Sequence, residues 1–187
     1  MKSSDLIALL KEVEPHRNEV AELDGELVPK SAVMLMSVLA AEVDSNARFE
    51  LYLNAIIECR AARRTAAAVK LAHAQYQEFH DVASLKVYSE ALTENGEVEA
   101  GVSRAKEALE LAIQKQTLVN YAAENLVRQA IKTGSAEAVN EVLDALADSK
   151  GDCALEADWA DEAEALGADK ELIAWVRAVV RAVAERK

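Results

Sequence analysis

The sequence predicts an all-α protein, and two features of its composition support this prediction. Alanine, the strongest helix former, occurs 37 times in 187 residues, whereas only eight residues are aromatic. Glycine and proline, which the tight turns of a β-rich fold require, occur only six and two times. We therefore expect one domain over residues 1–187, with about nine helices and no sheet.

Residues 1–46 are expected to form the N-terminal helices. A first helix is predicted over Asp5–Glu14, and Pro15 either ends it or opens a second turn. Gly25 follows this segment in the position of a helix C-cap. The next helix, predicted over Ala32–Val43, is apolar nearly all round, so it is either the most buried helix or an unpaired docking surface.

Residues 47–149 are predicted to form three helix pairs, and residues 150–187 a C-terminal helical cap. In Val98–Gln114 the apolar residues recur every three or four positions, which is typical of one helix face. Gly101 is unusual because it lies inside this helix, whereas Gly96, Gly134, Gly151 and Gly167 follow apolar segments as caps do. The expected helices are Ala47–Arg63, Ala66–Phe79, Ala83–Glu94, Val98–Gln114, Leu118–Lys132, Ala136–Leu146, Ala154–Leu166 and Lys170–Glu185.

A repeat of about 34 residues is indicated by three tyrosines near the starts of the three helix pairs. Tyr52, Tyr88 and Tyr121 are separated by 36 and 33 residues. Over Ala47–Ser149 the chain resembles the tetratricopeptide-repeat family, with degenerate motifs; an irregular helical bundle is the alternative. The resemblance implies a right-handed superhelical array of antiparallel helix pairs, whose first helices line a concave groove that binds a peptide or a partner helix.

Charge and the length of the apolar stretches limit the binding partners and the cellular location that the sequence favours. The net charge of −12 disfavours direct nucleic-acid binding, which needs Lys and Arg to neutralise phosphates, and disfavours anionic membranes. The longest apolar stretch, Ala32–Ala41, is too short to cross a bilayer. Cys59 and Cys153 form no paired motif, so we expect no bridge between them and a cytoplasmic location.

The residues that could carry chemistry do not form a recognisable catalytic or metal motif. His16, His73 and His80 lack further ligands at helical spacing, so they are expected to be partly exposed polar side chains without a metal. Cys59 is expected to be a small buried side chain. The six glycines are dispersed rather than gathered in a phosphate loop. We therefore expect a protein that is not an enzyme and holds no cofactor.

Two groups of polar residues are candidate binding sites. Arg60, Arg63 and Arg64 end a predicted helix, where the helix dipole alone accounts for cations; the alternative is an anion site for a carboxylate or phosphate. The second group faces the groove that the family resemblance implies, although a plain solvated face is the alternative. Its members are Asn54, Lys86, Asn120, Glu124 and Arg128.

The preferred functional hypothesis is a non-catalytic protein–protein interaction module that binds a peptide or partner helix in a groove. One alternative is an acidic helical protein that imitates nucleic-acid charge, since carboxylates are dense over Glu12–Glu26 and Asp144–Glu164. Another is a helical protein that binds a small ligand in a cavity between helices.

Overall fold

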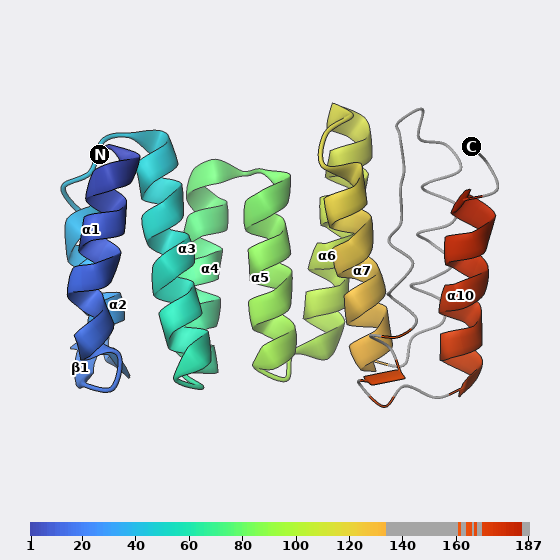
Figure 1. Ribbon diagram of the computed structural model, residues 1–187, viewed down its shortest axis with the longest axis horizontal. Coiled ribbons are helices and arrows are strands. Elements are labelled where there is room, and N and C mark those ends of the chain that lie inside the picture. Colours follow the sequence, from blue (N-terminus) through green and yellow to red (C-terminus); the bar gives the residue numbers. More distant parts are fainter. Residues whose placement is uncertain (134–160, 162–163, 166, 168–169, 185–187) are drawn as a thin grey trace. The chain divides into compact units, whose positions relative to one another are not determined.

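The computed structural model describes residues 1–133, 161, 164–165, 167 and 170–184 (Figure 1). These residues form α-helices, a 3₁₀ turn and one short β-hairpin, which confirms the all-α prediction and contradicts the prediction of no sheet. They group into two compact units, Met1–His80 (unit 1) and Asp81–Lys187 (unit 2). The single domain over residues 1–187, its superhelical arrangement and its division at residues 46 and 149 stay predictions.

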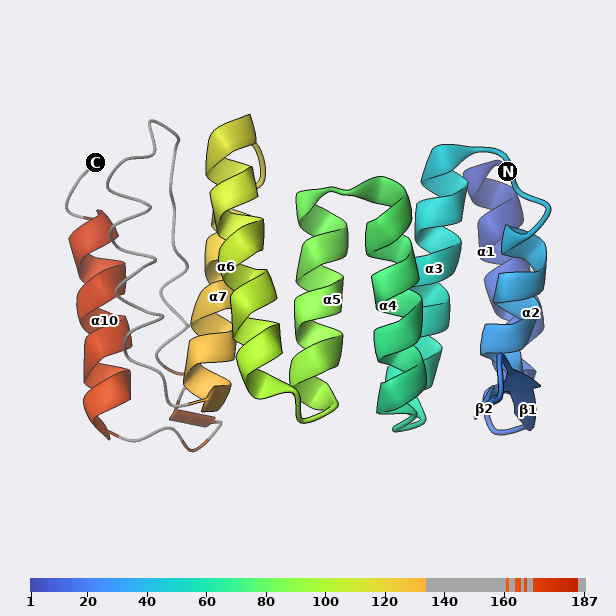
Figure 2. The same cartoon turned by 180° about the vertical axis from the view of Figure 1, so that it is seen from behind.

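Unit 1 contains two helix pairs and the hairpin. Its elements are α1 (Ser3–Val13), a 3₁₀ turn (Glu14–His16), β1 (Val20–Leu23), β2 (Glu26–Pro29), α2 (Lys30–Leu39), α3 (Ser45–Ala61) and α4 (Thr65–Phe79). Within this unit α1 and α3 form one layer and α2 and α4 the other, as the opposite views of Figures 1 and 2 show. Pro15 opens the 3₁₀ turn, which is the second of the two roles predicted for it.

The hairpin lies where a helix end at Gly25 is predicted, so that prediction is wrong. Its strands are antiparallel, with Leu23 opposite Glu26. The two turn residues between them, Asp24 and Gly25, have φ angles of 48° and 81°. Positive φ at both positions is the signature of a type I′ turn, whose twist matches that of the strands on either side. A glycine with positive φ suits a helix end equally well, and here the preceding aspartate favours the hairpin.

The helix α2 ends at Leu39, four residues before the predicted end at Val43. The guanidinium of Arg48 donates from Nη1 to the carbonyl oxygens of Leu39 and Glu42, at 2.8 and 2.9 Å. The Glu42 carboxylate accepts the backbone N–H groups of Val43 and Asp44, at 2.8 and 2.9 Å. These side chains satisfy backbone groups that would otherwise continue the helix, so the chain turns into α3 instead.

A charged group lies in the core of unit 1. Leu35 and Leu51 are fully buried there, and the residue Glu58 of α3 is only 6% exposed. Its carboxylate accepts hydrogen bonds from Arg17 Nε at 2.7 Å and from the buried Ser31 Oγ at 3.0 Å. Glu58 therefore joins α3 to the start of α2 and to the segment that leads into the hairpin.

A two-point ion pair connects the start of α3 with the end of α4. Arg48 donates from Nε and Nη2 to the two carboxylate oxygens of Glu78, at 2.5 and 2.8 Å. Both side chains are partly buried, at 25% and 30% exposure. The hydrogen bond from Arg48 lowers the pKa of Glu78, and the positive charge of Arg48 lowers it further, while burial opposes both effects.

Replacing Glu78 with glutamine is expected to make unit 1 less stable at neutral pH, by about 1 kcal/mol for a well-formed two-point pair. Because the pKa of Glu78 is lower in the folded protein, its stabilisation is present above the unfolded pKa and disappears as the pH falls through the folded pKa. The wild type and Glu78→Gln should therefore differ in urea denaturation at pH 7, and the difference should shrink as the pH falls through the folded pKa of Glu78. A difference that does not shrink on acidification, or that at pH 7 equals that of the exposed control Glu110→Gln, would contradict this.

Unit 2 is described through four helices, α5 (Val82–Glu94), α6 (Val98–Lys115), α7 (Val119–Thr133) and α10 (Lys170–Ala184). The boundaries of α5, α6 and α7 agree with the predicted helices to within one residue. The helix α5 buries seven of its 13 residues, against four of ten in α2, so the prediction that α2 is the most buried helix is wrong. The predictions for Ala136–Leu146 and most of Ala154–Leu166, with Gly134 and Gly151, lie outside the described residues.

Close packing of α5 against α6 depends on Gly101. This residue is buried, and a Cβ atom added to it would lie 2.1 Å from Thr93 Oγ1 and 3.0 Å from the carbonyl oxygen of Ser89. Ser89 also contacts α7, because the buried Asn125 of that helix donates from Nδ2 to Ser89 Oγ at 3.4 Å. Gln129, one turn further along α7, donates to Asn125 Oδ1 at 3.3 Å. Small and polar side chains thus set the spacing of α5 with both of its neighbours.

No helix among the described residues is both long enough and apolar enough to cross a lipid bilayer.

Candidate functional site

Side chains from α5 and α7 meet on one surface of unit 2. The Lys86 ammonium lies over the ring of Tyr121, with Nζ 4.6 Å from the ring centroid. The same ammonium donates to Glu90 Oε1 at 2.6 Å, one helical turn further along α5. The Lys86 and Glu90 side chains are only 13% and 16% exposed, and a cation–π contact stabilises by about 0.5–1 kcal/mol at exposed sites and about 2 kcal/mol when desolvated. Because α5 and α7 are not consecutive in the chain, this contact brings two separate parts of the sequence onto one face.

A polar stripe continues from Tyr121 along α7. Glu124 and Arg128 follow Tyr121 by three and seven positions, so all three side chains project from the same side of the helix. Arg128 Nη2 lies 2.8 Å from Glu124 Oε1, and the Tyr121 residue is 37% exposed. We name the five residues Lys86, Glu90, Tyr121, Glu124 and Arg128 the α5/α7 face.

The α5/α7 face includes three of the five residues predicted for the groove. Asn120 directly precedes Tyr121 on α7 and is half-buried. Asn54 lies in unit 1, where its Nδ2 donates to the backbone oxygen of Glu50 at 2.7 Å within α3. The convergence of Asn54 with the residues of unit 2 stays a prediction.

Glu50, Asn54 and Glu58 follow one another at four-residue spacing on α3, but they do not form one polar stripe in the structure. Glu50 and Asn54 reach the surface of α3, but Glu58 turns inward and Ile57, 45% exposed, takes its place. Two steps of four residues rotate a side chain by about 80° around a helix of 3.6 residues per turn. A stripe with strict four-residue spacing therefore drifts off one face. Ser89, three residues after Lys86 on α5, is likewise buried.

The three arginines of the predicted anion site lie around the turn between α3 and α4. Only Arg60 is inside α3, because the helix ends at Ala61. Arg63 has a φ of 57°, and the Arg64 N–H donates to the carbonyl oxygen of Cys59 at 2.8 Å, which closes the turn. The prediction that all three arginines lie at a helix C-terminus is therefore wrong. Arg64 precedes the N-terminus of α4, where the helix dipole does not favour a cation, and anion binding by this cluster stays a prediction.

Each of the three histidines has a polar or aromatic neighbour in unit 1. His16 Nδ1 is 2.7 Å from Glu19 Oε1, His73 Nε2 is 3.2 Å from Gln77 Nε2, and the His80 ring is 5.3 Å from the Tyr76 ring centroid. In the described part of the chain, no three His, Cys, Asp or Glu side chains are grouped as metal ligands would be.

Cys59 carries a free thiol that is fully buried in α3. Burial raises the pKa of this thiol to about 11, and the negative charge of Glu58 contributes to the increase. Almost none of the reactive thiolate form is therefore present at neutral pH. Cys153 lies outside the described residues.

Sequence reasoning did not identify the aromatic residue of the α5/α7 face. Tyr121 was informative only as a marker of the repeat, although tyrosine is common at interfaces because one side chain offers an apolar ring and a hydroxyl. The sequence does contain a signal for it, because Glu124 and Arg128 follow Tyr121 by three and seven residues and therefore share its helix face.

Comparison of the chain with models of protein families, with curated proteins and with solved structures finds no match.

Proposed function

We propose that the protein is a non-catalytic interaction module that binds a peptide or helix of a partner protein across the α5/α7 face. The observation that supports this is the contact of Lys86 on α5 with Tyr121 on α7, which gives two helices one shared surface. In the tetratricopeptide-repeat proteins that the chain resembles, the first helices of successive pairs line the binding groove, and α5 and α7 are such helices.

The chemistry of the α5/α7 face suits recognition of a protein segment. Tyrosine and arginine are the residue types enriched among those that contribute most to protein–protein affinity, and Tyr121 and Arg128 are both partly exposed. The charges of Lys86 and Glu90, and of Arg128 and Glu124, balance in pairs. A partner would therefore contact the Tyr121 ring with an apolar side chain and form hydrogen bonds with the paired charges around it.

The acidic-mimic alternative has less support in unit 1. In the stretch Glu12–Glu26, Glu19 lies 2.8 Å from Lys30 and Glu26 lies 2.6 Å from Lys70, so cations interrupt the negative surface there. An imitation of nucleic-acid charge needs carboxylates at the surface without such neighbours. The proposal also includes repeat-like stacking of the helix pairs and a cytoplasmic location, which the scarcity of cysteine supports.

The double variant Tyr121→Ala/Arg128→Ala is expected to lose affinity for peptides selected on the wild-type protein. A phage-displayed library of random 16-residue peptides would be selected against the immobilised full chain, and the enriched peptides would then be synthesised. Their dissociation constants, measured by fluorescence anisotropy, should rise at least about tenfold in the variant, which requires only ~1.4 kcal/mol. Its thermal midpoint should change little, because both side chains are partly exposed.

The matched control is Glu110→Ala/Lys115→Ala, which removes two exposed side chains from α6 in the same unit. It should leave the dissociation constants within about twofold of the wild type, since it does not touch the α5/α7 face. Peptides that bind both double variants equally well, or a selection that enriches no peptide, would overturn the proposed function.

A further inference from the structure

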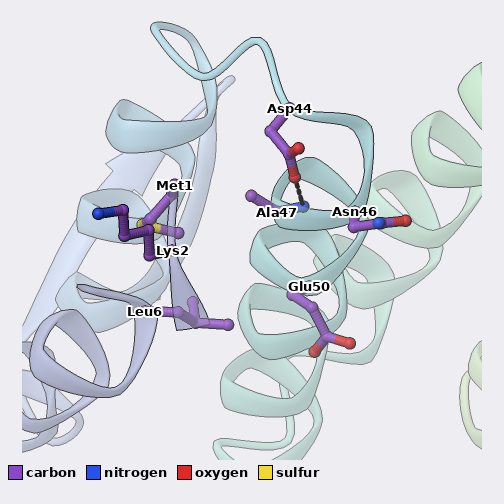
Figure 3. Close-up of a pocket in the computed structure, with 7 residues that line it drawn as sticks. All are labelled: Met1, Lys2, Leu6, Asp44, Asn46, Ala47 and Glu50. Atoms are coloured by element: carbon purple, nitrogen blue, oxygen red, sulfur yellow. Dashed lines mark hydrogen bonds between the residues drawn. The ribbon is translucent and has the colours of Figure 1, made fainter. Parts of the chain in front are cut away.

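A hollow of about 550 Å³ lies in unit 1 between the first turns of α1 and α3 (Figure 3). Leu6 points from α1 toward α3, and Ala47 lies opposite it at the start of α3. The helices α1 and α3 are the first helices of the two pairs of unit 1, as α5 and α7 are the first helices of the second and third predicted pairs. Between α5 and α7 the contact of Lys86 with Tyr121 joins the helices, whereas between α1 and α3 the space is open.

The wall that α3 contributes to this hollow is acidic. Asp44 and Glu50 are both exposed and both line it. One carboxylate oxygen of Asp44 accepts the Ala47 N–H at 2.8 Å, which leaves the other oxygen able to accept a hydrogen bond from a bound ligand. Among the described residues, no side chain pairs with the Glu50 carboxylate. Lys2 is the one cationic side chain among the lining residues. The α-ammonium of Met1 also lines the hollow, but it pairs with Glu42 Oε2 at 3.0 Å.

The other nearby positive groups are already engaged inside the protein. The N-terminus of α3 is capped by Asp44, and the backbone N–H of Lys2, at the start of α1, donates to Asp5 at 3.1 Å. Arg48, although it lies on α3, directs its guanidinium to Glu78 and to backbone oxygens. An anion would therefore find few free donors in the hollow, whereas a cation would find free carboxylate oxygens.

We propose that this hollow is a docking site for a basic segment of a partner protein, with an arginine or lysine placed between Asp44 and Glu50. The aliphatic part of that side chain would lie on Leu6 and Ala47, and its charged end would reach the carboxylates. This arrangement is the usual one for a long cationic side chain on a half-apolar surface. The charge of the whole chain, −12, favours the approach of a basic partner. The inference rests on the proposed function as an interaction module but uses a different unit.

The test uses the full chain and two fluorescein-labelled 12-residue peptides, one alternating arginine with leucine and alanine, the other carrying glutamate in place of each arginine. The first variant, Asp44→Asn/Glu50→Gln, removes two charges from the hollow and keeps an N-cap on α3. The second, Glu99→Gln/Glu110→Gln, removes two exposed charges from α6 in unit 2. At 150 mM salt the arginine peptide should bind the first variant at least tenfold more weakly than the wild type and the second variant within twofold.

Amide hydrogen exchange locates the binding and separates it from general charge attraction. The arginine peptide should slow exchange in the first turns of α1 and α3 and leave α5 and α7 unchanged. Equal weakening by both variants, equal binding of the glutamate peptide, or slowed exchange only in unit 2 would overturn the docking site. None of these results depends on Tyr121 or Arg128, so a failure here is distinguishable from a failure of the α5/α7 face.

Discussion

Replacing Gly101 with valine is expected to destabilise unit 2 by at least about 3 kcal/mol. An added Cβ would lie 2.1 Å from Thr93 Oγ1 and 3.0 and 3.1 Å from backbone atoms of Ser89 and Thr93, so α5 and α6 would have to separate. Overfilling a packed site costs about 1–3 kcal/mol, and valine adds two methyl groups beyond that first carbon. Urea denaturation followed by circular dichroism would measure the loss as a lower transition midpoint.

The variant Gly101→Ala separates the effect of packing on stability from the effect of helix propensity. In an exposed helix interior, glycine to alanine stabilises by roughly 0.5–1 kcal/mol, but Gly101→Ala is expected to destabilise because of the contact with Thr93. Removing the obstructing oxygen in Thr93→Ala/Gly101→Ala should recover part of the loss, as expected for two residues in contact. If Gly101→Ala alone stabilised the protein, the close approach of α5 and α6 would be wrong.

Replacing Glu58 with alanine is expected to destabilise unit 1 by about 2–3 kcal/mol. The substitution removes the acceptor for both Arg17 Nε and the fully buried Ser31 Oγ. A buried hydroxyl without a partner costs about 1–3 kcal/mol, whereas Arg17, about half-exposed, can return to water at little cost. The free energy of unfolding, obtained from urea titration at pH 7, gives the change directly.

Two further variants show whether the hydrogen bonds to Glu58 cause this loss. Glu58→Gln keeps the shape and one acceptor oxygen, so it should lose less stability than Glu58→Ala. In Glu58→Ala/Ser31→Ala no hydroxyl remains to be satisfied, so the double variant should be less destabilised than the sum of the single variants. Strict additivity would show that Ser31 and Glu58 do not interact.

Helix positions could be predicted from the sequence because local patterns determine them. The three- and four-residue spacing of apolar residues in Val98–Lys115, with Gly96 before it, locates α6 to within one residue. The hairpin was missed although its signal is local, because Gly25 suits either structure and Asp24 was not considered with it. The early end of α2 depends on Arg48, whose reach back to Leu39 only the folded chain reveals.

The candidate site could be predicted only in part, for a different reason. Helical spacing places Glu124 and Arg128 on one stripe, but it does not show that Lys86 on another helix lies over Tyr121. That contact depends on how α5 and α7 pack, and small residues inside the unit set this packing. Spacing also failed at Glu58, because a charged side chain can be buried when Arg17 and Ser31 satisfy it.

The buried thiol of Cys59 provides a chemical probe of transient local opening in unit 1. Since its pKa is about 11 and no part of its surface is exposed, a thiol reagent reacts with it only while α3 is transiently displaced. In a Cys153→Ser background, the labelling rate at Cys59 would report how often α3 is displaced. A substitution that loosens unit 1, such as Glu58→Ala, should then speed labelling. Gly101→Val in unit 2 should leave the labelling rate unchanged if the opening is local to unit 1, and should raise it if the opening is global.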